Sequence, residues 1–406
     1  MKIHTRFSIK PIGLDNCSTI DFTKYSYVIK FHSATGEQSI LHTENENVFS
    51  KDGHSLLHFF EYSKSSKIPL ARCDIYCSGK ITDRNIYINS FPNDNLSNSW
   101  TIFNKKFSKG ETTSNSNYDK ICNISNHRIF IDSQYPVGNP LDPFEKSKIE
   151  RQLKARLTKP TPALSQIDYI YHPYPHQGES SLCGPATFFY ALLKDNPRIY
   201  SQYIKDLWNS GKAMLGSIEV KPSQGCCHPT KYSKPSGKTR TPAIDWISMA
   251  SLRDTFNDDG YYSPDDKVRG ITMSDDIANW ANAVGGKVIY NSGISYTSSW
   301  NQDLVTWLNN YISSDYHVAV LINDGLLSDT WSWNITPTHW IMWTGKLISE
   351  KTKKPVDKST SSDTLVDLEL FSWGEVRLMN QYRKMAPTLS EFCKSIYGAV
   401  IFKKIP

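Results

Sequence analysis

The sequence predicts an α+β fold for the second half of the chain, in which a helical section precedes an antiparallel sheet. Apolar side chains first recur at helical spacing, and further along they form short alternating or unbroken runs that are typical of strands. The first 140 residues instead combine strand-like alternation with long polar turns rich in Asn and Ser. We therefore expect a β-rich N-terminal module in front of an α+β domain.

The elements of the α+β domain can be placed in chain order from these patterns. The expected helices cover 183–194, 198–210, 243–255, 274–284 and 301–313. The expected strands cover 286–291, 317–323, 339–348, 364–372 and 396–403. A polar loop at 351–363 joins two of these strands and predicts a hairpin. In the N-terminal module, we expect strands at 25–32 and 84–89.

The two parts of the chain are joined by a charged, helix-prone segment. Pro143 suits the first turn of such a helix, and Pro160 and Pro162 end it. We therefore divide the chain into an N-terminal β-rich module of unknown role at 1–140, a helical linker at 141–164 and the α+β domain at 165–406.

Composition and charge exclude several classes of protein. Of 406 residues, 39% are apolar and 12% aromatic, which is enough to build cores and argues against wholesale disorder. The net charge of +6 (46 basic minus 40 acidic residues) is spread along the chain, so we expect no nucleic-acid partner.

The N-terminus has no secretory signal, and no stretch is long enough for a membrane span. We expect synthesis in the cytoplasm and, if the protein is exported, a route without a cleaved leader.

The eight cysteines are irregularly spaced and do not predict a disulfide framework. Cys226, Cys227 and His228 gather two thiols and an imidazole, but a structural zinc site needs four ligands, usually in two spaced pairs. Because no second pair lies nearby, we expect no metal and no cofactor. We interpret the vicinal cysteines as part of a loop at a substrate cleft.

One cysteine lies where a catalytic thiol is expected. Cys183 opens a helical run in which Pro185 suits the first turn, and Gln177 precedes it by six positions (183 − 177). A helix N-terminus favours a thiolate, and an upstream glutamine can direct its amide to an oxyanion. We interpret Cys183 as a nucleophile with a lowered pKa, Gly184 as room for a substrate backbone, and Gln177 as an oxyanion donor. The alternative is a buried structural cysteine.

A histidine far downstream can supply the base. His339 precedes an unbroken apolar run at 340–343, which indicates a central strand. At the first position of such a strand, an imidazole can reach a thiolate across a cleft and act as a general base. A hydrogen-bonded core histidine is the alternative.

Hairpin geometry predicts a third residue of the catalytic group, which would orient His339. In a strand–turn–strand hairpin, the end of the second strand lies beside the start of the first. The tripeptide Ser372-Trp373-Gly374 should therefore lie beside His339, so that Ser372 or a nearby backbone carbonyl orients the imidazole. Asp367 and Glu369 lie further from that end of the strand.

These motifs resemble the papain-like cysteine peptidase superfamily over about the last 240 residues (165–406). The Cys183-Gly184-Pro185-Ala186 block is most similar to the bacteriocin-processing branch. The resemblance implies that Cys183 is the nucleophile, His339 the base and Gln177 the oxyanion residue. Papain-type enzymes carry Asn-Ser-Trp-Gly where this chain has Phe371-Ser372-Trp373-Gly374, so the site is either a dyad or a triad with an unusual third member.

The expected reaction is hydrolysis of an amide, above all of a peptide bond in a protein or peptide substrate. The same groups would serve glutamine deamidation, transglutamination or cleavage of a cell-wall peptide, because these reactions differ in what occupies the cleft. A non-catalytic adaptor that keeps the fold is the alternative of another class. The layout also resembles bacterial toxin effectors, which implies secretion into a target cell and a secretion-system component, an immunity protein or a chaperone as partner.

Overall fold

The computed structural model describes residues 2–11, 23, 25–32, 38–40, 48–52, 54–56, 58–61, 70–77, 86–89, 119–124, 129–135, 141–158, 172–295, 300–328 and 338–406. The chain divides into two compact units, Met1–Lys148 and Ile149–Pro406. This division falls inside the segment 141–164, which is expected to be a helical linker. Pro160 and Pro162 lie outside the described residues.

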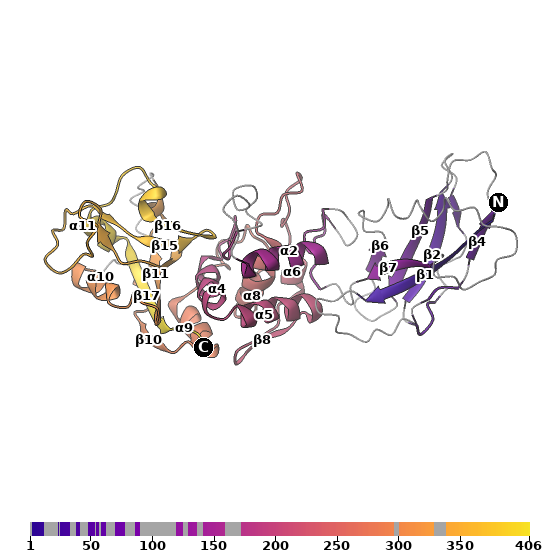
Figure 1. Ribbon diagram of the computed structural model, residues 1–406, viewed down its shortest axis with the longest axis horizontal. Helices are drawn as coiled ribbons and strands as arrows, with labels where there is room; N and C mark the ends of the chain where they lie inside the picture. Colours follow the sequence, from indigo (N-terminus) through magenta and orange to yellow (C-terminus); the bar gives the residue numbers. More distant parts are fainter. Residues whose placement is uncertain are drawn as a thin grey trace. The chain divides into compact units, whose positions relative to one another are not determined.

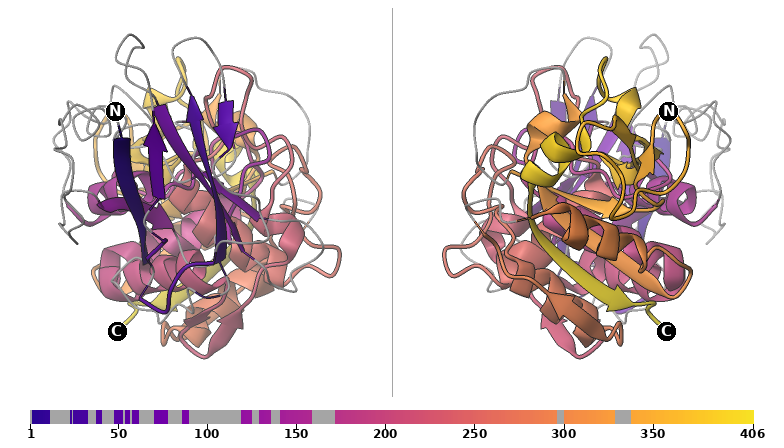
Figure 2. Two further views of the ribbon diagram at one scale, coloured as in Figure 1. Left: turned by 90° about the vertical axis from the view of Figure 1, so that its right-hand side faces the viewer. Right: turned by 90° about the vertical axis from the view of Figure 1, so that its left-hand side faces the viewer.

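The first unit contains strands in two sheets (Figure 2, left, indigo and violet). In one sheet, β1 (Lys2–Pro11) lies between β4 (His58–Glu61), which is antiparallel to it, and β7 (Asp119–Ile124), which is parallel. The other sheet is antiparallel and has the order β3 (Gln38–Ile40), β2 (Tyr25–His32), β5 (Leu70–Cys77), β6 (Ile86–Asn89). The strand expected at 25–32 is confirmed. Of the strand expected at 84–89, residues 84 and 85 lie outside the described residues.

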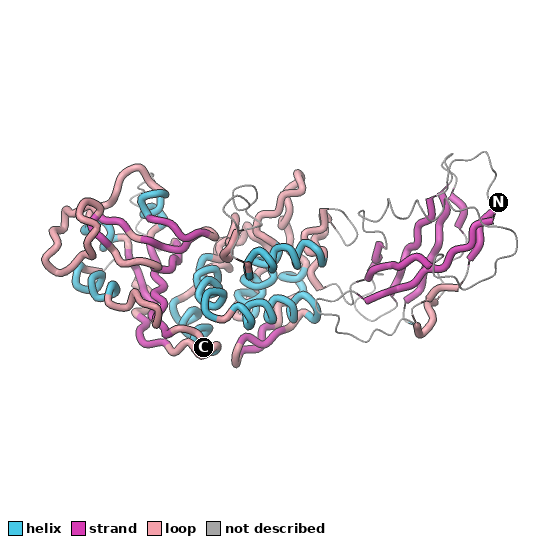
Figure 3. Tube along the Cα trace, viewed as in Figure 1, coloured by secondary structure: helices cyan, strands magenta, loops and turns pink. Residues whose placement is uncertain are grey.

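The second unit is α+β, as predicted, with one group of helices and, apart from it, a main sheet that has further helices beside it (Figure 3). Its helices include α2 (Lys146–Leu157, which begins at the end of the first unit), α4 (Cys183–Asp195), α5 (Pro197–Ser210), α6 (Gln224–Cys227), α7 (Ala243–Asp245), α8 (Ser251–Thr255), α9 (Ser274–Ala283), α10 (Gln302–Asn309) and α11 (Leu389–Lys394). A short hairpin of β8 (Ala213–Leu215) and β9 (Ile218–Val220) follows α5. The helices expected at 183–194, 198–210 and 274–284 are confirmed to within one residue at each end.

Local sequence explains where α5 begins and ends. Asn196 caps it, because its Oδ1 accepts a hydrogen bond from the Ile199 N–H at 3.1 Å, and Pro197 occupies the first turn. Gly211 ends the helix with a positive φ of 70°, a conformation that costs glycine little. The buried side of α5 carries Tyr200 and Tyr203, which pack on Phe189 of α4 at ring-centroid distances of 6.0 and 5.4 Å.

The helix expected at 243–255 is present but irregular in its middle. Between α7 and α8, residues Trp246–Ala250 form a π-helical turn, a feature often found at functional sites. Every residue from 243 to 252 is buried, so the helix lies in the core and does not present the polar face of an amphipathic surface helix. Two carboxylates, Asp245 and Asp254, are buried with it.

The main sheet is antiparallel, with the strand order β10-β17-β11-β12-β15-β16. Its strands are β10 (Val288–Asn291), β17 (Ile396–Lys403), β11 (Tyr316–Ile322), β12 (His339–Trp343), β15 (Glu369–Ser372) and β16 (Glu375–Leu378). Strand β12 is buried along its whole length, which confirms the interpretation of its apolar run as a central strand.

Helix α4 packs between the other helices and the sheet (Figure 1), where Tyr190 stacks on Phe371 of β15 at 4.2 Å. The other face of the sheet shares a core with α10 and α11, to which Ile341 and Trp343 contribute. Strand β17 runs on towards the C-terminus (Figure 2, right). Successive residues of β12 face opposite sides of the sheet, and both sides are covered by protein. This explains why apolar and polar side chains do not alternate along residues 340–343.

Two elements end several residues before their predicted ends. The strand predicted at 339–348 leaves the sheet after Trp343, where the N–H groups of Thr344 and Gly345 both donate to the Glu369 carbonyl. It resumes as β13 (Ile348–Ser349), which pairs with β14 (Val366–Asp367) in a separate two-stranded sheet. The helix predicted at 301–313 ends at Asn309, whose side chain instead bonds the backbone of Leu347. Among the described residues, no helix has the length and apolarity that crossing a membrane requires.

Candidate active site

Cys183 is the first residue of α4, and three backbone N–H groups reach its sulfur. These are its own N–H, that of Gly184 and that of Trp340 on β12. The first two are available because the N-terminal N–H groups of a helix have no intrahelical partner, and Leu182 at the cap position forms no side-chain cap. Cys183 as a whole residue is partly exposed, whereas its thiol is surrounded by protein. The thiol therefore lies where the start of α4 meets the start of β12.

The thiol of Cys183 has a raised pKa, so the expectation of a lowered value is wrong for the resting protein. The main cause is burial, which removes water from the thiolate. The three N–H groups lower the pKa, but they do not outweigh the burial. Helix position alone predicted the sign incorrectly because the sequence did not reveal how closely the sheet covers the helix start. At pH 7 the thiol is protonated.

His339, the first residue of β12, is 4% exposed, and its Nε2 lies 2.7 Å from Ser372 Oγ at the end of β15. Its ring stacks on Trp373 at 4.7 Å with an interplanar angle of 16°. Burial lowers the pKa of His339 to about 4, against a smaller opposing effect of Asp324. The imidazole is therefore neutral at pH 7 and able to accept a proton.

A tight turn brings Ser372 and Trp373 to the histidine. Ser372 pairs with Glu375, so Trp373 and Gly374 are the two loop residues of the hairpin, with φ of 44° and 77°. Positive φ at both positions is the signature of a type I′ turn, and it is strained for tryptophan. A Cβ on Gly374 would lie 2.7 Å from His176 Cδ2, so glycine is required for close packing as well as for conformation.

Gln177 lies in a braced loop ahead of α4. Gly178, with φ of 61°, packs against the Arg240 carbonyl, to which the Glu179 N–H donates at 2.8 Å. The Thr241 hydroxyl donates to the Gln177 carbonyl at 3.0 Å, while the Gln177 amide Nε2 donates to the Ser180 carbonyl at 3.2 Å. The amide is thus engaged within its own loop, and it has to leave Ser180 before it can bind an oxyanion.

A buried ion pair holds the chain just before Gln177. Arg156 of α2 and Asp245 are both fully buried and in contact. Arg156 also donates to the His172 carbonyl at 2.8 Å, and the His176 N–H donates to Asp245 Oδ2 at 2.9 Å. Burial raises the pKa of Asp245 to about 6, while Arg156 and the His176 N–H limit the rise, so the carboxylate is ionised at pH 7.

This pair was not predicted from the sequence. The available signal was Asp245 within an otherwise apolar helical run and Arg156 in a helix expected to be a linker. Nothing in the sequence indicated that the two would meet, 89 positions apart (245 − 156).

The structure brings three of the four candidate residues to the meeting point of α4, β12 and β15. Ser372 is hydrogen-bonded to His339, as the hairpin argument predicted, and the residue after His339 contacts the Cys183 sulfur. No hydrogen bond joins the Cys183 thiol to the His339 ring. Within the part of the chain that the structure describes, His339 Nδ1 has no hydrogen-bond partner. The arrangement supplies the Cys183 thiol at a helix start, the neutral imidazole of His339 as a base, and the Ser372 hydroxyl, which is hydrogen-bonded to the Nε2 of that imidazole.

The space above Gly184 is filled by protein. A Cβ at this position would lie 2.4 Å from Thr272 Cβ. The expectation that Gly184 makes room for a substrate backbone is therefore wrong, since it makes room for Thr272. The carbonyl of Thr272 accepts a hydrogen bond from the Trp340 indole Nε1 at 2.9 Å.

The vicinal cysteines belong to the core. Cys226 and Cys227 lie on α6 and are both buried, and the Trp246 indole donates to the Cys226 carbonyl at 2.9 Å. The interpretation as a cleft loop is therefore wrong. In the described part of the chain, no group of three or more His, Cys, Asp or Glu side chains is arranged to hold a metal ion. Burial raises the pKa of Cys227 to about 12, as expected for an inert structural thiol.

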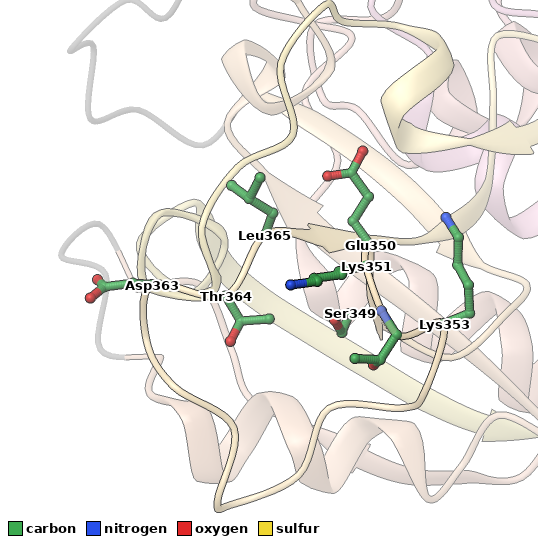
Figure 4. Close-up of a pocket in the computed structure, with 8 residues that line it drawn as sticks. Ser349, Glu350, Lys351, Lys353, Asp363, Thr364 and Leu365 are labelled. Carbon is green, nitrogen blue, oxygen red and sulfur yellow. Dashed lines mark hydrogen bonds between the residues drawn. The ribbon is translucent and has the colours of Figure 1, made fainter.

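A surface pocket of about 670 Å³ lies away from these residues (Figure 4). It is lined by residues 349–353 and 363–365, at the polar hairpin loop and the short β13–β14 pair. None of its lining residues belongs to the candidate catalytic group.

Comparisons of the whole chain with protein-family profiles, with curated protein sequences and with solved structures give no match.

Proposed function

We propose that the protein is a papain-like cysteine peptidase that hydrolyses a peptide bond with Cys183 as nucleophile. One observation carries the proposal. The Cys183 thiol, at the start of α4, accepts a hydrogen bond from the backbone N–H of Trp340. The residue before Trp340, His339, is buried and neutral, and its Nε2 is hydrogen-bonded to the Ser372 hydroxyl. A nucleophile, an adjacent base and a group that orients the base are the parts that thiol acyl transfer needs.

In the proposed mechanism, His339 Nδ1 takes the thiol proton as the sulfur attacks the substrate carbonyl carbon. For Nδ1 to accept it, the proton of the neutral ring must sit on Nε2, from where it donates to Ser372 Oγ. The Cys183 thiol and the His339 ring have to come within hydrogen-bond distance for this step, and hydrogen bonds between catalytic groups often form only with substrate bound. Trp373, stacked on the ring, limits the orientations that the imidazole can adopt.

The developing oxyanion is held by the Cys183 N–H and, once it has left the Ser180 carbonyl, by the Gln177 amide. The tetrahedral intermediate collapses when the imidazolium protonates the leaving amine, which breaks the C–N bond and leaves a thioester on Cys183. Water, deprotonated by His339, then attacks the thioester, and the thiol regains its proton as the acid is released.

The resting pair differs from a thiolate–imidazolium ion pair. The thiol pKa is raised and that of His339 is lowered, so both groups are neutral at pH 7 and the proton moves only during attack. Proton transfer by a positioned base then contributes about 10²- to 10⁴-fold to the rate.

We expect the pH profile to reveal this neutral pair. Only neutral His339 accepts the proton, so kcat/KM should be flat near neutrality and fall to half near pH 4. The folded pKa of His339 lies below its ordinary value of 6.5, so its contribution to stability is complete above pH 6.5 and declines as the pH falls towards 4. Circular dichroism at each pH therefore has to accompany the peptide-cleavage rates. A half-point near pH 6.5 in folded protein would contradict the neutral-pair assignment.

A peptide library tests the proposed reaction directly. The full-length protein and its Cys183→Ala variant are incubated with tryptic peptides of a bacterial proteome, which are then analysed by mass spectrometry. New peptide termini with the wild type alone support peptidase activity. Glutamines converted to glutamate, without new termini, would assign the same thiol to deamidation. If neither product depends on Cys183, the proposal fails and an adaptor role takes its place.

A further inference from the structure

Two histidines that the proposed mechanism does not use, His172 and His176, lie against the tight turn between β15 and β16. Their rings are in edge-to-face contact, with a centroid distance of 4.9 Å and an interplanar angle of 71°. A Cβ on Gly374, the second loop residue of the turn, would lie 2.7 Å from His176 Cδ2 and 3.0 Å from His172 Nδ1. Because this turn brings Ser372 to the base and His176 directly precedes Gln177, the two rings connect both parts of the proposed site.

The ring of His176 holds the backbone around Gln177. The Gly178 N–H donates to His176 Nδ1 at 2.8 Å, so this bond spans Gln177 and closes a turn about it. Burial, followed by the effects of His172 and Arg156, lowers the pKa of His176 to about 3. The ring is therefore neutral at pH 7. Since Nδ1 accepts a hydrogen bond, the ring proton is on Nε2.

The ring of His172 holds the turn. Its Nδ1 lies 3.2 Å from the Gly374 carbonyl oxygen, and because a carbonyl can only accept, Nδ1 is the donor. The carboxylate of Glu375, the next residue, lies 3.9 Å from the same nitrogen. One histidine thus fixes the backbone of the turn, while the other, His176, fixes the backbone of the Gln177 loop.

The backbone of Gln177 is bound on both sides of its side chain. Ahead of it, the His176 N–H donates to Asp245 Oδ2 at 2.9 Å, and after it, the Gly178 N–H is bound by the His176 ring. The Gln177 carbonyl accepts a hydrogen bond from the Ser180 hydroxyl at 2.5 Å. The amide can therefore leave the Ser180 carbonyl by rotation of side-chain bonds alone, and a donor carried on a fixed backbone is preorganised for an oxyanion.

We infer that His176 is a positioning residue that keeps the Gln177 amide aligned with the His339 base. Its ring links the backbone of the oxyanion donor to the turn that orients the base, although the donor and the base lie 162 positions apart (339 − 177). The inference rests on the proposed peptidase function, because Gln177 binds an oxyanion only if Cys183 attacks a carbonyl. It deepens that function by adding a residue that acts on the reaction through Gln177.

Two amide substitutions of His176 test this role without removing a catalytic group. His176→Asn places its side-chain oxygen where Nδ1 lies and can still accept the Gly178 N–H. His176→Gln carries its amide one bond further out, near the position of Nε2, and loses that acceptor. His317→Gln is the control, because it removes another buried, hydrogen-bonded imidazole, which binds Asp195 at the opposite end of α4. Urea unfolding of each variant ensures that rates are compared on folded protein.

His176→Gln should lower kcat on a peptide from the library experiment by about 10- to 100-fold with KM little changed, because a misplaced donor weakens only the transition state. His176→Asn should keep most of kcat, and His317→Gln should keep all of it. Iodoacetamide alkylates Cys183 without forming an oxyanion, so its rate should be the same in the wild type and in both His176 variants. A loss of stability alone would not separate kcat from the alkylation rate.

A double-variant cycle attributes the effect to Gln177. If His176 acts through the Gln177 amide, His176→Gln should lower kcat no further in a Gln177→Ala background. Equal losses in His176→Asn and His176→Gln, or a full additional loss in the Gln177→Ala background, would overturn the positioning role and leave the proposed function standing. An unchanged kcat in His176→Gln would do the same. Absence of Cys183-dependent cleavage by the wild type would remove the proposed function and the inference with it.

Discussion

Replacing His339 by alanine is expected to lower the rate of peptide cleavage by about 10²- to 10⁴-fold, the range for loss of a positioned general base. The loss should be large because the thiol cannot activate itself, since burial raises its pKa and leaves it protonated at pH 7. Without the imidazole, neither the thiol proton nor the leaving amine has a partner for proton transfer. The rate is measured as kcat/KM on a peptide identified in the library experiment.

A graded comparison makes this expectation specific. Ser372→Ala removes only the hydroxyl that holds Nε2, so it should cost much less than His339→Ala, by about tenfold or less, the scale of one neutral hydrogen bond. Equal losses in the two variants would mean that the imidazole does not act as the base. Unchanged cleavage by His339→Ala would remove the proposed mechanism altogether.

Position along the chain was enough to predict much of this site. A hairpin has only one way of bringing its second strand back, so the meeting of Ser372 and His339 followed from the order of apolar and polar runs. The start of α4 at Cys183 followed from the Pro185 turn and the apolar periodicity behind it. These features are local, and local features leave a pattern in the sequence.

The features that the sequence did not predict depend on which distant segments pack together. The sign of the Cys183 pKa shift is set by burial against β12, and the role of Gly184 by Thr272, which lies 88 positions later (272 − 184). Neither contact has a pattern of its own in the sequence.

The largest effect on stability is expected for Arg156→Met. The substitution leaves the fully buried Asp245 carboxylate without its cation, and breaking a buried pair from one side costs about 3–5 kcal/mol. The free energy of unfolding is measured from urea denaturation followed by tryptophan fluorescence. Lys358→Met is the matched control, because it removes the cation of an exposed pair whose side chains are 79% and 66% accessible, and such pairs contribute about 0–1 kcal/mol.

Two further measurements attribute the loss to the charge. The double variant Arg156→Met/Asp245→Leu removes both charges and should regain much of the stability, since well-packed apolar replacements of buried pairs are often neutral. In Arg156→Met alone, the pKa of Asp245 should rise beyond its native value of about 6, because the cation that lowers it is gone. A group with a raised folded pKa loses its contribution to stability as the pH rises, so the variant should be less impaired at pH 5 than at pH 8.

The same variant links stability to the candidate site. Arg156 and Asp245 hold the backbone at His172 and His176, directly ahead of Gln177. If this brace positions the oxyanion donor, the double variant, although stable, should keep its iodoacetamide rate at Cys183 and lose kcat on the peptide substrate. A double variant with full stability and unchanged kcat would restrict the ion pair to a structural role.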